Sequence, residues 1–117
     1  MKNIGFAAVL LALASASTAA LVAPARAQTP GYDSQGCGWY IILGCSKNQA
    51  AARRTLQQLG GPGVGGGAGA QVLDTSNMGG FRPGFFCVAD GPYISSDDAG
   101  SVAWVEAVPD AYVKRGC

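Results

Sequence analysis

Four cysteines, at positions 37, 45, 87 and 117, constrain the fold of this chain more than any other feature. An even number of cysteines in an exported protein favours a disulfide framework, and four cysteines allow three connectivities. A zinc site is the alternative. It is disfavoured because the chain contains no Cys-x-x-Cys motif and no histidine. We therefore expect disulfides, although Cys45 and Cys87 are also compatible with buried free thiols.

The disulfide interpretation depends on export, and residues 1–27 have the features of a signal peptide. Lys2 gives a positively charged start, an apolar stretch follows from Ile4 to about Val22, and the sequence ARA at 25–27 has the small-x-small pattern that signal peptidases accept. We expect cleavage after Ala27, a periplasmic location and no stable membrane insertion after cleavage. An uncleaved anchor is the alternative, because the apolar stretch is about long enough to cross a bilayer. Its serines and alanines make it weakly hydrophobic for that role.

Composition excludes several classes of function. Cleavage would leave residues 28–117, enough for one small domain. Loss of Lys2 and Arg26 leaves six basic residues against seven acidic ones, a net charge of −1, which argues against nucleic acid as a partner. Because histidine is absent, the commonest general base and metal ligand is missing. We predict a protein that is not an enzyme and that uses no metal or cofactor.

The first half of the domain contains signals for a strand, a helix and a loop. Residues 28–36 are polar and rich in turn formers, which predicts a flexible N-terminal lead before a domain over 37–117. The aromatic and β-branched run WYIIL at 39–43 predicts a buried strand. Ser46 stands three residues before Gln49, a capping-box spacing that predicts a helix over about 50–59. The glycine-rich stretch at 60–69 predicts a flexible surface loop.

The second half repeats this pattern. Residues 70–74 and 85–89 predict two strands, separated by turn material and followed by Gly91 and Pro92. Ser95, with acidic residues at 97 and 98, predicts the start of a helix that ends before Pro109. Residues 111–114 predict the last strand. The order β-α-β-β-α-β is typical of a split βαβ, ferredoxin-like fold of the α+β class. Its four-stranded antiparallel sheet carries two helices on one face and leaves the other face free.

The same residues resemble the SPOR (sporulation-related repeat) family. The similarity lies in YIILG at 40–44 followed by QA at 49–50, in FCVADGPY at 86–93 followed by DA at 98–99, and in DAYV at 110–113. It spans about Trp39–Lys114. The resemblance implies an envelope module that binds peptidoglycan glycan strands, preferring those stripped of stem peptides, across the sheet face opposite the helices. The alternative is a periplasmic protein–protein interaction module of the same fold, with envelope proteins as partners.

Strand alternation predicts which residues would face the glycan. If the odd-numbered residues of 39–43 point toward the helices, then Tyr40, Phe85 and Tyr112 would form an aromatic platform on the other face. The alternative is that these aromatic residues simply cover a small sheet. The predicted glycan-binding residues are Tyr40, Ile42, Arg82, Phe85, Cys87, Ala89, Tyr112 and Lys114.

The strand order expected for this topology, 4-1-3-2, also bears on the disulfides. The last strand would lie antiparallel beside the first, so that Cys117 comes close to Cys37 and a bridge between them closes a long loop. A parallel alignment of the first and third strands would place Cys87 about 16 Å from Cys45 along the strand. We therefore predict the pair Cys37–Cys117. Pairing Cys45 with Cys87 as well requires a different register or a bend in the strand.

Overall fold

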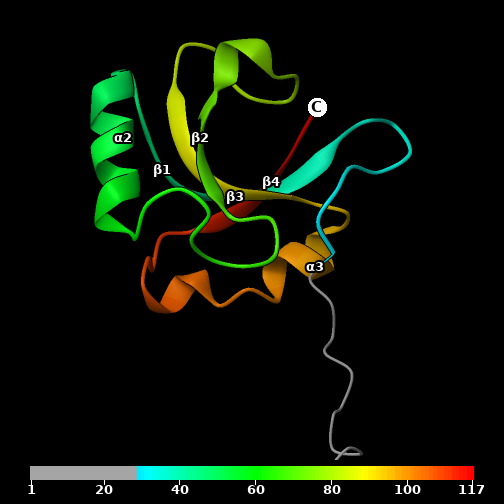
Figure 1. Ribbon diagram of the computed structural model, residues 1–117. Helices are drawn as coiled ribbons and strands as arrows, with labels where there is room; N and C mark the ends of the chain where they lie inside the picture. Colours follow the sequence, from blue (N-terminus) through cyan, green and yellow to red (C-terminus); the bar gives the residue numbers. More distant parts are fainter. Residues whose placement is uncertain (1–28) are drawn as a thin grey trace, which may run out of the picture.

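The computed structural model describes residues 29–117, so the predicted signal peptide and its cleavage point lie outside the described residues. These residues form an α+β fold with a four-stranded antiparallel sheet and two α-helices (Figure 1). The strands are β1 (Gly38–Ser46), β2 (Ala70–Asp74), β3 (Phe86–Tyr93) and β4 (Tyr112–Gly116). The helices are α2 (Gln49–Gln58) and α3 (Ser96–Gly100), and the short 3-10 helices are η3 (Thr75–Asn77) and η4 (Trp104–Glu106).

The strand order is β2-β3-β1-β4, as expected, but β1 and β3 run antiparallel. The parallel alignment expected for these two strands was therefore wrong. In the antiparallel register Cys45 lies directly opposite Cys87, and the two are disulfide-bonded across the ladder. The predicted bridge between Cys37 and Cys117 is present as well. Together the two bridges join β1 to both of its neighbouring strands. Cys37–Cys117 lies at the start of β1, and Cys45–Cys87 lies near its end.

Helix α2 begins at Gln49, and its N-cap is Asn48, whose side chain accepts a hydrogen bond from the Ala51 amide. Asparagine is among the best N-cap residues, and here it takes the place predicted for Ser46. The hydroxyl of Ser46 instead accepts a hydrogen bond from the Asn48 amide in the preceding turn. The helix ends where Gly61 donates to the Leu56 carbonyl, since glycine readily adopts the positive φ needed there.

The second predicted helix is much shorter than expected. Ser95 caps α3 as predicted, by accepting a hydrogen bond from the Asp98 amide, but α3 ends at Gly100. A 3-10 turn at Trp104–Glu106 replaces the rest of the predicted helix. The preceding strand, β3, runs through Gly91 and Pro92 to Tyr93 rather than ending at Ala89.

The N-terminal lead, expected to be flexible, is hydrogen-bonded to the sheet. The Gly31 amide donates to the Pro92 carbonyl, and the Ile94 amide donates to the Thr29 carbonyl. Farther along the lead, Asp33 accepts hydrogen bonds from Nε and Nη2 of Arg115 in β4, at 3.1 and 2.8 Å. The lead therefore follows the end of β3 and is tied to β4.

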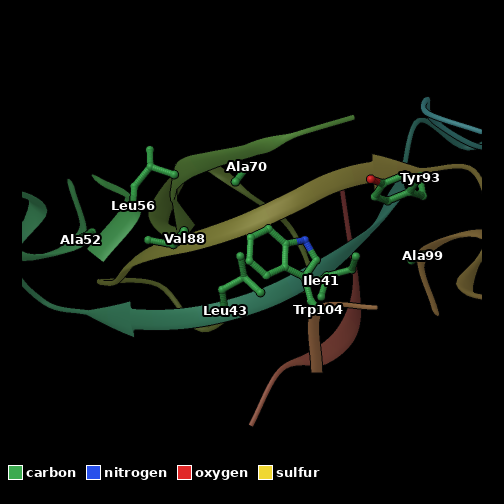
Figure 2. Packing of buried hydrophobic residues seen from close by; sticks show 9 residues of the cluster. All are labelled: Ile41, Leu43, Ala52, Leu56, Ala70, Val88, Tyr93, Ala99 and Trp104. Atoms are coloured by element: carbon green, nitrogen blue, oxygen red, sulfur yellow. The ribbon is translucent and has the colours of Figure 1, made fainter. Parts of the chain in front are cut away.

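Side chains of β1 alternate between two faces as predicted. Ile41 lies in a cluster with Ala52 of α2 and Ala99 of α3, so both helices cover one face of the sheet (Figure 2). Tyr40 and Ile42 lie in a second cluster on the other face. Both clusters are buried, and the sheet is therefore packed on both sides.

The second face is covered by the segment 75–85, between β2 and β3. Met78 and Phe81 of this segment pack against the second cluster, and the Phe81 ring meets Tyr40 edge-on with centroids 6.1 Å apart. Gly79 exchanges two backbone hydrogen bonds with Cys117. In Figure 1 this segment lies above the sheet, while the segment containing α3 lies below it. The expectation of a free sheet face was therefore wrong, because the predicted turn material folds back as a cover.

Candidate functional site

A hollow of about 270 Å³ opens beside the Cys45–Cys87 bridge, where the cover segment meets the sheet. The segment 75–85 provides one side of the hollow and β4 provides another. Besides the two cysteines, the lining residues are Thr75, Phe81, Arg82, Phe85, Tyr112 and Lys114.

Thr75 positions the aromatic side of this hollow. Its hydroxyl donates to the Phe85 carbonyl at 3.1 Å and accepts from the Phe85 amide at 2.9 Å. The Thr75 amide donates to the same carbonyl at 2.9 Å. Because Thr75 is buried, these bonds fix the base of the cover segment and leave the half-buried Phe85 ring beside the hollow.

Three basic side chains, those of Lys47, Arg82 and Lys114, lie near the aromatic rings of this site. Lys114 Nζ lies 5.5 Å from the centroid of the Phe81 ring, and Lys47 Nζ lies 5.7 Å from that of Phe85, both within the range of a cation–π contact. Arg82 is exposed at the rim. Within residues 29–117 the single ion pair joins Arg115 to Asp33, so none of these three cations is paired with a carboxylate.

Five of the eight predicted glycan-binding residues line this hollow: Arg82, Phe85, Cys87, Tyr112 and Lys114. Tyr112 is the most accessible aromatic among them, with 54% of its surface exposed. Cys87 contributes mainly through the disulfide, since the residue itself is buried. These residues come from β3, β4 and the cover segment, and the fold brings them together at one end of the sheet.

The other three predicted residues, Tyr40, Ile42 and Ala89, lie beneath the cover segment. Each is at most 3% exposed, so none offers surface to a ligand. Burial also raises the pKa of the Tyr40 hydroxyl well above its ordinary value. The aromatic platform expected from Tyr40, Phe85 and Tyr112 therefore does not form, because Phe81 covers its first member.

Cys45, Thr75 and Phe81 line the hollow and Lys47 lies over Phe85, but the sequence patterns do not identify these four residues as parts of the site. Phe81 follows two glycines in a stretch that was treated as turn material. A large aromatic residue in such a stretch indicates that the stretch packs against the sheet, because a small domain has little other apolar material to cover a sheet. Lys47 was not identified because its role depends on the turn that places it over Phe85.

A second polar cluster lies on the helix side, around the fully buried Asp90. Its carboxylate accepts hydrogen bonds from the Tyr93 hydroxyl at 2.8 Å, from Trp104 Nε1 at 2.7 Å and from the Gly66 amide at 2.9 Å. Burial, together with the bond to Asp90, raises the pKa of Tyr93 well above its ordinary value. With its oxygens engaged and no surface exposed, this carboxylate is structural.

The Asp90 cluster also holds the glycine-rich loop in place, although the composition of this loop predicts flexibility. The Gly66 amide reaches Asp90, and the Ala68 amide donates to the Tyr93 hydroxyl at 3.3 Å. A Cβ atom on Gly65 would lie 2.5 Å from Asp90 Oδ2 and 2.8 Å from Trp104 Cζ2. Glycine is therefore needed for the loop backbone to lie directly on the buried carboxylate.

No group of three or more histidine, cysteine or acidic residues able to hold a metal occurs within residues 29–117. In the same part of the chain no helix is long and apolar enough to cross a membrane. Comparison of the chain with protein-family models, curated proteins and solved structures gives no match.

Proposed function

We propose that this protein is an exported, non-enzymatic binding module of the SPOR type, which binds peptidoglycan glycan strands in the periplasm. The observation that carries the proposal is the hollow, where Phe85 and Tyr112 lie beside Arg82 and Lys114, two cations that form no ion pair within residues 29–117. Aromatic rings cover the apolar faces of sugars, and cations hold carboxylates. Glycan strands stripped of stem peptides carry both features, because removing the peptide leaves a free carboxylate on the sugar.

The proposed site differs from the one expected from the family resemblance. A glycan strand lying across the middle of the sheet would contact the cover segment rather than Tyr40 and Ile42. The glycan is instead proposed to contact the hollow at the end of the sheet. Export is supported by the two disulfides, which form and persist in oxidising compartments.

Sedimentation with purified sacculi tests this proposal. The oxidised chain should sediment with sacculi, and more of it should do so after the stem peptides have been removed. The double variant Arg82→Gln/Lys114→Gln should bind at least about tenfold more weakly, as expected for the loss of two charge-assisted contacts. The matched control is Arg53→Gln/Arg54→Gln, which removes the same charge from the exposed face of α2. Equal weakening by both double variants, or no binding by the wild-type chain, would contradict the proposal.

A second candidate function is binding of an extended peptide from an envelope protein. β1 continues to Ser46, whereas its pairing with β4 ends at Ile42, so the last part of β1 has an open edge on that side. A second hollow lies along this edge, lined in part by Val108 and Asp110, and it shares Cys45 and Tyr112 with the first hollow. Such an edge can accept a further strand. Asp110→Lys should then disrupt a complex with a periplasmic protein, whereas Arg82→Gln/Lys114→Gln should leave that complex intact. Loss of the complex in the second variant alone would exclude this candidate.

A further inference from the structure

The two disulfides differ in their surroundings, although each joins a buried cysteine to an exposed one. Cys87 is 2% exposed and Cys37 is 4% exposed, whereas Cys45 and Cys117 are exposed. A thiolate from solvent therefore reaches Cys45 in one bridge and Cys117 in the other. Access alone does not distinguish the two bridges.

Charge does distinguish them. The Cys45–Cys87 bridge forms part of the wall of the hollow, together with Arg82 and Lys114, and Lys47 lies over the ring of Phe85. The cation nearest to the other bridge in sequence is Arg115, and it is paired with Asp33 at 2.8 Å. Each bridge also has a carboxylate in its surroundings, because Asp33 accepts a hydrogen bond from the Cys37 amide and Asp110 lines the second hollow together with Cys45.

Thiol–disulfide exchange is sensitive to this difference. The attacking species is a thiolate, and the sulfur that leaves also departs as a thiolate. Nearby cations attract the first and stabilise the second, and a cation that is already ion-paired, as Arg115 is, does so much less. The hollow thus supplies an electropositive approach to one bridge only.

We propose that the Cys45–Cys87 disulfide is a thiol-exchange site, entered through the hollow and selective for anionic thiols. The thiolate sulfur bonds to Cys45 Sγ, the Cys45–Cys87 bond breaks, and its electron pair goes to Cys87 Sγ, which takes a proton from solvent. A second thiolate attacks the incoming sulfur of the mixed disulfide and releases Cys45. Two thiols are thereby oxidised to one disulfide, and the cysteine pair gains two electrons. This inference does not depend on glycan binding.

The experiment compares three small thiols on the full chain with both disulfides formed. They are anionic 2-mercaptoethanesulfonate, neutral 2-mercaptoethanol and cationic cysteamine, used at low ionic strength. Alkylation and mass mapping at successive times give the opening rate of each bridge. The ratio of the two rates within one molecule cancels the intrinsic reactivity of each thiol.

The expected result is that Cys45–Cys87 opens first, with a rate ratio roughly tenfold larger for the anionic thiol than for the cationic one. Added salt should reduce this difference. Arg82→Gln/Lys114→Gln should reduce it as well, while the control Arg53→Gln/Arg54→Gln should leave it unchanged. The proposal is overturned if Cys37–Cys117 opens first, if both bridges open together, or if the ratio is the same for all three thiols.

Discussion

Individual residues explain why the glycine-rich stretch is not a free loop. Asp90 is fully buried, and it receives its hydrogen bonds from one loop amide and two aromatic side chains. A buried carboxylate that loses a donor bears the full desolvation penalty, so the loop backbone has to stay close to it. Composition alone predicts flexibility here, because the constraint comes from a residue 24 positions away from Gly66.

This role of the loop gives a prediction at Gly65. Gly65→Ala should destabilise the protein by about 2–4 kcal/mol, since a methyl group would press on Asp90 and Trp104 in addition to straining a positive φ. Gly63→Ala is the matched control. Gly63 also has a positive φ but has open space around it, so about 1–2 kcal/mol is expected. Denaturant unfolding of both oxidised variants measures the difference, and equal losses would show that the contact with Asp90 is unimportant.

At the scale of elements, the cover segment 75–85 decides what the sheet can present to a ligand. Removing its aromatic side chain by Phe81→Ala should destabilise the protein by about 2–3 kcal/mol, less than for a fully buried phenylalanine. It should also shift the pKa of Tyr40 back toward its ordinary value of 10.0, because burial is the main cause of the increase. Ultraviolet titration of the tyrosines and denaturant unfolding test both effects.

Arg82→Ala is the control for this experiment, since it changes an exposed neighbour in the same segment. Its unfolding free energy should stay within about 0.5 kcal/mol of wild type. If Phe81→Ala left the Tyr40 titration unchanged, the segment would not be the cover that the packing indicates.

The N-terminal lead is a second element with a measurable effect, because it makes the free energy of unfolding depend on pH. The hydrogen bonds from Arg115, and then that from the Cys37 amide, hold the pKa of Asp33 below its ordinary value of 3.8. A carboxyl group with a lowered folded-state pKa stabilises the protein above its unfolded-state pKa, and this contribution is lost as pH falls through the folded-state value. The free energy of unfolding should therefore decrease below about pH 4.

Asp33→Asn should remove this part of the acid sensitivity. The variant should be less stable than wild type at pH 6, and the difference between them should shrink by pH 3. Asp110→Asn serves as the control because Asp110 is exposed and outside the ion pair. Denaturant unfolding at both pH values provides the measurement. A constant difference between Asp33→Asn and wild type would contradict the assigned role of Asp33.

At the scale of the whole molecule, the sequence was most informative where local chemistry decides the structure. The order of strands and helices and the alternation along β1 could be predicted from apolar patterns and turn residues, and the Cys37–Cys117 bridge from the strand order expected for that topology. The cover over the sheet could not, because Phe81 acquires its role from a contact with the distant Tyr40. The Cys45–Cys87 pair depends on the direction of β3 relative to β1, because a parallel alignment separates these cysteines and the antiparallel one places them opposite each other.

The candidate site follows the same division. Alternation identified the correct face for Phe85, Tyr112 and Lys114, but not that the middle of this face is covered. What remains accessible is the end of the sheet, where the exposed Cys45 of one disulfide, aromatic rings and the cations Arg82 and Lys114 meet. The proposed export is consistent with both proposed roles, because disulfides persist outside the cytoplasm and peptidoglycan is accessible there.

The most direct test of glycan binding at the hollow is amide NMR of the labelled, oxidised chain during titration with soluble peptidoglycan glycan fragments that lack stem peptides. If the hollow binds glycan, saturable shifts are expected at Cys45, Phe85, Tyr112 and Lys114, with amides near Arg53 and Arg54 on α2 unaffected. Shifts confined to α2 or to the lead, or a spectrum that does not change at all, would show that the hollow is not the glycan-binding site.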